Sequence, residues 1–175
     1  MKNLKNKLNT NQKLIIYIIG NKNAYKINTY ELIKILWYTD MFMFLTYKKQ
    51  LTNYIYKKYP IGPFDEEINH DIQKLCDMNI IEYSQKPIET ECIEFKLKQS
   101  PVKINFSVKQ TDIINKTIKD IKENYNQYFP YEKVKDKIWE TAEDFAEIQI
   151  STYLYAYPAP EEIDKDDIDW AKSCI

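Results

Sequence analysis

Apolar residues recur at helical spacing near the start of the chain. A first run covers residues 11–19 and stops at Gly20, a residue type that commonly ends helices. The second run begins at Asn28, whose side chain can cap the first turn while Glu31 reaches back to it, as in a capping box. Because residues 41–45 are apolar on every side of that helix, we predict that it is central and the most deeply buried.

Two other stretches alternate between apolar and polar residues, as strands do. Thr52–Lys58 is rich in tyrosine and β-branched residues, and it predicts a short strand that ends at Tyr59 and Pro60. The alternation across residues 93–97 is the clearest strand pattern in the chain. We therefore expect a small β element beside the helices.

A turn and a third helix lie between these two strands. Pro60 and Pro63 restrict the backbone on both sides of Gly62 and force the chain to turn. The three acids at positions 65–67 then suit the positive N-terminal end of a helix, for which Asn79 is the expected C-terminal cap.

Two further helices and an acidic tail complete the predicted order. The first of these helices stops at Pro130, and the second carries apolar residues at 134, 138, 142 and 145. The tail, residues 158–175, surrounds Trp170 and is either a docked terminal helix or partly disordered. The patterns together predict a mainly α fold: a compact helical bundle with a small antiparallel β element, formed by residues 1–175 as a single domain.

The charged residues narrow the choice of partner. All 25 basic residues are lysines, so the chain has no guanidinium group for the bidentate contacts that arginine makes with guanine or phosphate. Acids balance the lysines to a net charge of −1, so nothing draws the whole protein to a polyanion. We expect no nucleic-acid partner.

The cysteines and the apolar runs indicate the compartment. Three widely spaced cysteines, without a Cys-x-x-Cys pair, read as free thiols in a reducing cytosol. The longest apolar runs are far shorter than the ~20 residues of a membrane span, and no signal-peptide pattern follows the N-terminus. We therefore predict a cytoplasmic protein with no membrane partner.

Patterns typical of enzymes are lacking. With only two glycines the chain has no phosphate-binding loop, and its serines lack a nucleophile elbow. Glu67 and His70 have the Glu-x-x-His form of metal sites in helical bundles, but the chain has no second histidine to complete such a site. We predict no catalytic, cofactor-binding or metal-binding residues.

Two features carry the remaining candidate sites. Asp40 lies in the most apolar helix, where its carboxylate either anchors a polar network that shapes a partner-binding surface, or only holds the fold through a hydrogen bond to a tyrosine, a lysine or the backbone. Tyr54, Tyr56, Tyr59 and Phe64 form an aromatic strip around the turn. Such a strip is typical of protein interfaces, and the alternative is that about half of it lines the core.

Two short motifs resemble a known family. Leu36-Trp37-Tyr38-Thr39-Asp40 closes an apolar run in the second helix and resembles the Leu-Tyr-Phe-Ala-Asp pattern of the SocA-like antitoxins, the Panacea domain. The turn at Gly62-Pro63 matches the Gly-Pro turn of that family, and the resemblance covers residues 12–83. It implies that Trp37, Tyr38, Asp40, Gly62 and Pro63 form a structural motif.

The resemblance also implies a function. Members of the family are compact, mainly helical antitoxins that neutralise partner toxins by direct protein contact, and some deliver the toxin to a protease. By this resemblance the chain is an antitoxin-like protein without enzymatic activity, encoded on a mobile element or phage. Its partner is then a protein toxin, or another host or phage protein. The rival interpretation is a winged-helix DNA-binding regulator, with the helix at 65–78 and the following strands as helix and wing.

Overall fold

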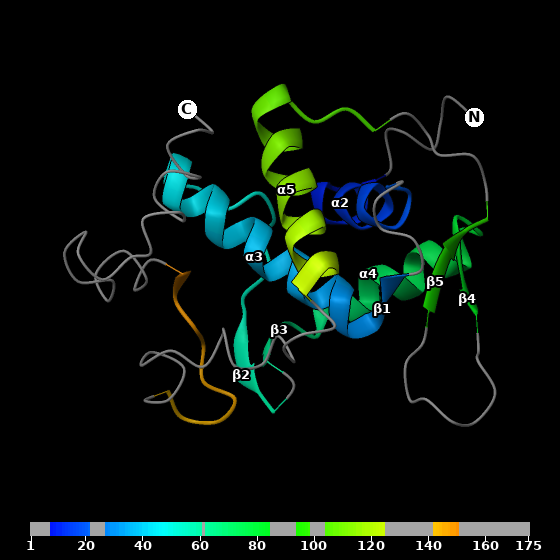
Figure 1. Cartoon of the computed structure of the whole chain (residues 1–175). Helices are drawn as coiled ribbons and strands as arrows, with labels where there is room; N and C mark the ends of the chain where they lie inside the picture. Colours follow the sequence, from blue (N-terminus) through cyan, green and yellow to red (C-terminus); the bar gives the residue numbers. More distant parts are fainter. Residues whose placement is uncertain are drawn as a thin grey trace.

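Helices dominate the described part of the chain, and small strands lie between them (Figure 1). The computed structural model describes residues 8–21, 27–60, 62–84, 94–98, 104–124 and 142–150. In chain order the elements are α2 (Thr10–Ile19), β1 (Ile27–Asn28), α3 (Thr29–Tyr47), β2 (Lys57–Tyr59), β3 (Gly62–Phe64), α4 (Glu67–Asp77), β4 (Ile81–Ser84), β5 (Glu94–Leu97) and α5 (Val108–Asn124). These include the first four helices that the sequence predicts, the fourth of them as far as Asn124.

Helix α3 is the centre of the fold, as its apolar pattern predicts. Its buried side chains extend from Glu31 to Met43, and α2, α5 and β3 all pack against it. Figure 1 shows α5 crossing α3, with the β2–β3 hairpin at one side and α4 with the larger sheet near the N-terminal end of α3. Most side chains that project from the middle of α3 are therefore buried.

The capping box predicted at the start of α3 is confirmed. The Asn28 side chain accepts a hydrogen bond from the Glu31 backbone N–H at 2.9 Å, and Glu31 Oε2 accepts from the Asn28 backbone N–H at 2.9 Å. Glu31 Oε1 also receives Lys122 Nζ of α5 at 2.8 Å. One carboxylate thus caps α3 and fastens it to α5.

Helix α2 ends at Gly20, as predicted, and two close neighbouring atoms favour glycine at this position. The Gly20 backbone has ordinary helical angles, but a Cβ there would lie 2.7 Å from Leu97 Cδ1 of β5 and 3.1 Å from the Ile16 carbonyl oxygen. The end of α2 therefore lies so close to the sheet that alanine would fit only if the end of the Leu97 side chain moved aside.

The strands form two antiparallel sheets. The larger has the order β1-β5-β4, so that β5 pairs with β4 and with the distant β1. The strand predicted at 93–97 is confirmed over Glu94–Leu97, and Ile93 lies outside the described residues. The smaller sheet is the β2–β3 hairpin, in which Lys57 pairs with Phe64 and Tyr59 with Gly62.

The strand predicted at 52–58 is confirmed only at its end, in β2. Side chains from elsewhere take the backbone N–H groups that a neighbouring strand would have bound. Those of Leu51 and Thr52 donate to Asp40, at 2.9 Å each, and that of Ile55 donates to Asp65 at 2.6 Å. The segment keeps its alternation of buried and exposed residues without joining a sheet.

Helix α4 begins and ends close to the predicted residues. The helix begins at Glu67, the third of the three acids, and the side chain of the first, Asp65, accepts a hydrogen bond from the Glu67 backbone N–H at 2.9 Å. Asn79 adopts a left-handed backbone with φ 58°, and the next N–H, that of Ile80, bonds to the Leu75 carbonyl at 3.0 Å. The predicted cap is confirmed.

The last predicted helix is wrong where the structure describes it, at residues 142–150. Lys58 N–H donates to the Ala146 carbonyl at 2.9 Å, Phe145 N–H to the Lys58 carbonyl at 2.8 Å, and Ile148 N–H to the Tyr56 carbonyl at 2.7 Å. The segment therefore pairs with β2 on the side away from β3, and these bonds replace those of a helix. The positions predicted to be helical at 134 and 138 lie outside the described residues, as does the predicted end of the preceding helix at Pro130.

The fold class is therefore mixed α/β, and the prediction of a mainly α bundle holds only in part. The predicted β element is antiparallel, as expected, but the described residues divide it between two sheets and the paired segment at 142–150. The acidic tail at 158–175 lies outside the described residues, and the single domain over 1–175 stays a prediction.

Candidate functional site: a buried polar network beneath an exposed hairpin

Asp40 is completely buried in the middle of α3. One carboxylate oxygen accepts from the backbone N–H groups of Leu51 and Thr52 at 2.9 Å each. The other accepts from the Tyr56 hydroxyl at 2.8 Å and from the Thr52 hydroxyl. The expected internal bonds to a tyrosine and to backbone amides are therefore present, and they tie the chain after α3 back onto the helix.

Burial and hydrogen bonding act on Asp40 in opposite directions. Loss of water raises the pKa of its carboxyl above the ordinary 3.8, and the bonds from Thr52, Tyr56 and Leu51 lower it, with burial the larger effect. The charged form is thus held by four donors in a place where it is costly.

A second buried carboxylate, Asp71 of α4, joins the same region. Gln12 of α2 donates to it at 2.9 Å and the Tyr54 hydroxyl donates at 3.0 Å. Sequence reasoning missed Asp71, although a signal was present: it directly precedes Ile72 on the face that also buries Ile68. We call Asp40, Asp71 and their side-chain partners Gln12, Thr52, Tyr54 and Tyr56 the buried polar network.

The network fixes the segment that leads into the hairpin. Thr52, Tyr54 and Tyr56 point inward in turn, while Asn53 and Ile55 are exposed between them. Burial, and then the nearby carboxylates, raise the pKa of Tyr54 and Tyr56 far above its ordinary value, so both hydroxyls stay protonated as donors. The inward residues of a single extended segment thus bond to α3 and α4.

The aromatic strip divides into core and surface. Tyr54, Tyr56 and Phe64 are only 3%, 1% and 6% exposed, and Trp37 packs edge-on against Tyr56 with ring centroids 4.9 Å apart. For these three residues, burial therefore favours the alternative that part of the strip lines the core, and it corrects their assignment to a partner-binding surface. Of the strip, only Tyr59 retains substantial exposure.

The remaining motif residues surround this core. Tyr38 is half-buried beside Phe42, with ring centroids 6.0 Å apart. Gly62 has φ 112°, and a Cβ there would meet nothing within 4 Å, so glycine serves the backbone angle rather than close packing. Pro63 is buried and lies opposite Lys58 in the hairpin.

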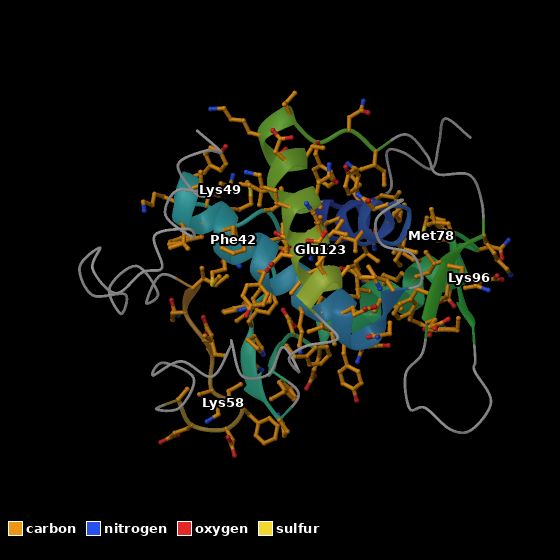
Figure 2. The ribbon with its side chains drawn as sticks, viewed as in Figure 1. Phe42, Lys49, Lys58, Met78, Lys96 and Glu123 are labelled. Carbon is orange, nitrogen blue, oxygen red and sulfur yellow. The ribbon has the colours of Figure 1, made fainter. Side chains whose placement is uncertain are left out.

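The outer side of the hairpin is aromatic and acidic. The Tyr59 ring lies between Phe64 and Phe145, with centroids 5.2 and 5.1 Å away, and its hydroxyl donates to Glu66 at 2.6 Å. Lys58 Nζ donates to the Ala142 carbonyl at 2.9 Å and lies 3.5 Å from Asp144 (Figure 2). The side chains of β2 thereby fasten the segment 142–150 to the hairpin.

His70 is exposed on α4. Its Nδ1 lies 3.0 Å from Glu67, and Lys74 lies 3.5 Å from the same carboxylate. Across the described residues, no three His, Cys, Asp or Glu side chains are grouped so that they could hold a metal ion.

A comparison with models of known families shows to which family the chain belongs. The family described as "Antitoxin SocA-like, Panacea domain" matches residues 32–156, well over half of the chain. The chain belongs to this family. The match begins in the first turn of α3 and extends past the segment 142–150, so the Panacea domain includes the late pairing with β2 that the resemblance over 12–83 left out. Neither the curated proteins nor the solved structures contained a match.

In the part of the chain that the structure describes, none of the helices has the length and apolar character to cross a bilayer.

Proposed function

We propose that this Panacea-domain protein is an antitoxin that neutralises a protein toxin by binding it directly, without enzymatic activity of its own. The observation that carries the proposal is the family match over residues 32–156. The proposed setting is the cytoplasm of a bacterium, with the gene on a mobile element or phage beside the gene of its toxin.

The architecture supports a binding role. The chain before β2 is held by hydrogen bonds that it donates to Asp40 of α3 and Asp71 of α4, and the segment 142–150 pairs with the other side of β2. A surface that is ordered before its partner arrives loses less conformational entropy on association. The hairpin is such a surface.

The rival DNA-binding function has one structural point in its favour and one against. Helix α4 is followed by the antiparallel pair β4–β5, the order of a helix and a wing. However, Glu66 and Glu67 are exposed at the N-terminal end of α4, with Asp65 beside them, where a phosphate would meet three negative charges. We therefore keep protein binding as the proposal.

A co-expression experiment tests it. The gene beside this one is expressed alone and together with this chain, and growth is followed. We expect the neighbouring product to stop growth alone, the pair to grow, and the two proteins to co-purify. A harmless neighbour, or rescue without any complex, would contradict the proposal. Submicromolar binding of the purified chain to random duplex DNA at physiological salt would favour the regulator instead.

Complex formation alone leaves two routes to neutralisation. Sequestration predicts that the toxin accumulates in the complex, and delivery to a protease predicts that toxin levels fall when the antitoxin is present. Following toxin abundance after synthesis is stopped, in cells with and without the antitoxin, separates the two.

A further inference from the structure

We propose that Tyr59 and Phe145 form the contact point for the partner, and that they fit an apolar pocket bordered by lysine or arginine residues. We call these two side chains the Tyr59–Phe145 patch. This inference rests on the proposed function and adds to it a location and a partner chemistry.

Exposure singles out Phe145. It is 59% exposed, although its ring touches Tyr59 with centroids 5.1 Å apart, and Tyr59 is itself partly exposed. Ile55 is also more than half exposed, and it faces outward, like Lys57, from the extended segment that leads into the hairpin. Aromatic side chains carry a large share of the binding energy in protein interfaces, because they cover much area with few rotatable bonds.

The backbone makes the choice of phenylalanine costly. Phe145 has φ 65°, a left-handed conformation that glycine or asparagine adopts readily and a bulky residue rarely does. The pairing of its N–H with the Lys58 carbonyl at 2.8 Å holds it there. A residue that is both strained and largely exposed gains little for folding, and such residues concentrate at functional sites.

Charge indicates what the partner presents. Exposed carboxylates border the patch: Glu143 and Asp144 precede Phe145, Glu147 follows it, and Glu66 accepts the Tyr59 hydroxyl. The lysines of β2 are fewer than these carboxylates, and Lys58 already contacts Asp144 and donates to the Ala142 carbonyl. An apolar tip with an acidic border is complementary to a pocket with a basic border, and such complementarity speeds association.

The patch is held firmly enough to act as an anchor. Tyr59 lies in β2, between β3 and the segment 142–150, and Phe64 supports its ring from the buried side. Ile148 and Ile150, at the end of the same segment, are buried in the core. The exposed ring of Phe145 is therefore carried by a segment that is held by its pairing with β2 and by its own buried isoleucines.

The experiment measures binding of purified chain to the purified product of the neighbouring gene. Phe145→Asn removes the ring and suits the left-handed backbone. We expect its Kd to rise at least about tenfold while its melting temperature stays within a few degrees of wild type or rises. Val108→Asn is the matched control, because Val108 is 78% exposed at the start of α5, and Figure 1 shows that this end of α5 lies far from the hairpin. Its Kd should remain within about twofold.

A second variant tests the charge. Glu143→Lys changes an exposed side chain, and we expect a slower association rate and a weaker dependence of that rate on salt. It also keeps the inference testable if Phe145→Asn fails to fold, because an unchanged association rate would then overturn the proposed basic border.

The outcomes separate the two proposals. If the neighbouring product binds wild type and Phe145→Asn equally well, the patch is overturned and the antitoxin proposal stands. If it does not bind wild type at all, the antitoxin proposal fails, and the patch assignment fails with it. If wild type is a dimer that Phe145→Asn makes monomeric, with partner binding unchanged, the patch is a contact between copies of this chain and the inference is overturned.

Discussion

Asp40 shows how one residue can set the path of the chain. A carboxylate is the side chain that accepts the most hydrogen bonds in a small space, and Asp40 uses this capacity to hold Leu51, Thr52 and Tyr56. Its position in an apolar helix marked it as a candidate, and the expected type of partner was correct. The identity of those partners could not be predicted, because they lie 11 to 16 residues further along the chain and reach Asp40 only after the chain reverses.

Two substitutions of Asp40 should show how much of its effect on stability comes from its hydrogen-bond acceptors and shape and how much from its charge. Asp40→Ala leaves four donors without their acceptor, and we expect a loss of about 3 kcal/mol or more in the free energy of unfolding. Asp40→Asn keeps one oxygen and the shape, and should lose less. Urea unfolding of both variants measures this. Equal stability of Asp40→Ala and wild type would contradict the role assigned to the carboxylate.

The pH dependence of Asp40 has a definite sign. Because burial raises its pKa in the folded chain above 3.8, the folded state binds more protons than the unfolded state between 3.8 and the raised pKa. The stability of wild type relative to Asp40→Asn should therefore be greatest below about pH 3.8, fall as the pH rises through that window, and become constant above it. Unfolding both proteins across pH 3 to 8 provides the difference. A relative stability that instead rises with pH would show that the hydrogen bonds outweigh burial.

At the scale of elements, local signals were reliable and pairing was not. The cap of α3 and the two ends of α4 depend on residues at most five positions apart, and all three were predicted. The course of 142–150 depends on β2, more than 80 residues earlier, and there an apolar spacing at 142 and 145 was mistaken for a helix. The backbone groups of such a segment bond either within a helix or to a strand that is distant in the sequence. The spacing of apolar residues does not show which of the two forms.

The β2–β3 hairpin needs glycine at position 62 because of its backbone angle, and a substitution can test this. Gly62 has φ 112° with open space where a Cβ would lie, so Gly62→Ala adds backbone strain without a clash. We expect a loss of about 1–3 kcal/mol, measured by thermal or urea unfolding. Gly20→Ala is the contrasting variant, because there the angles are ordinary and the cost comes from crowding against Leu97. Adding Leu97→Ala should therefore relieve part of the cost at Gly20 and none of the cost at Gly62.

The segment 142–150 should prove part of the folded unit. Ile148 is buried in the core and its N–H bonds to the Tyr56 carbonyl, while the next residue, Gln149, is exposed. Ile148→Ala should cost about 2–4 kcal/mol of unfolding free energy, and Gln149→Ala less than about 0.5 kcal/mol. Similar small losses in both would mean that the segment contributes little to stability in solution.

At the scale of the whole molecule, stability and binding are assigned to different layers. Carboxylates from α3 and α4 form the inner layer, the inward tyrosines connect it to the hairpin, and the Tyr59–Phe145 patch lies outermost. Family membership locates the domain, but it does not distinguish these layers. The sequence pattern grouped Tyr59 with three side chains that the core absorbs, because alternation alone does not say which side of a segment faces the solvent.

This layering predicts that Asp40 affects the partner only through folding. Asp40→Ala should weaken capture of the neighbouring gene product at 37 °C in proportion to the fraction unfolded, because only the folded chain presents the hairpin. At a temperature where melting curves show the variant fully folded, its Kd should equal that of wild type. Phe145→Asn should behave in the opposite way, with weak binding at every temperature and unchanged folding. If folded Asp40→Ala still binds weakly, the carboxylate shapes the partner surface itself, and the inner layer belongs to the interface.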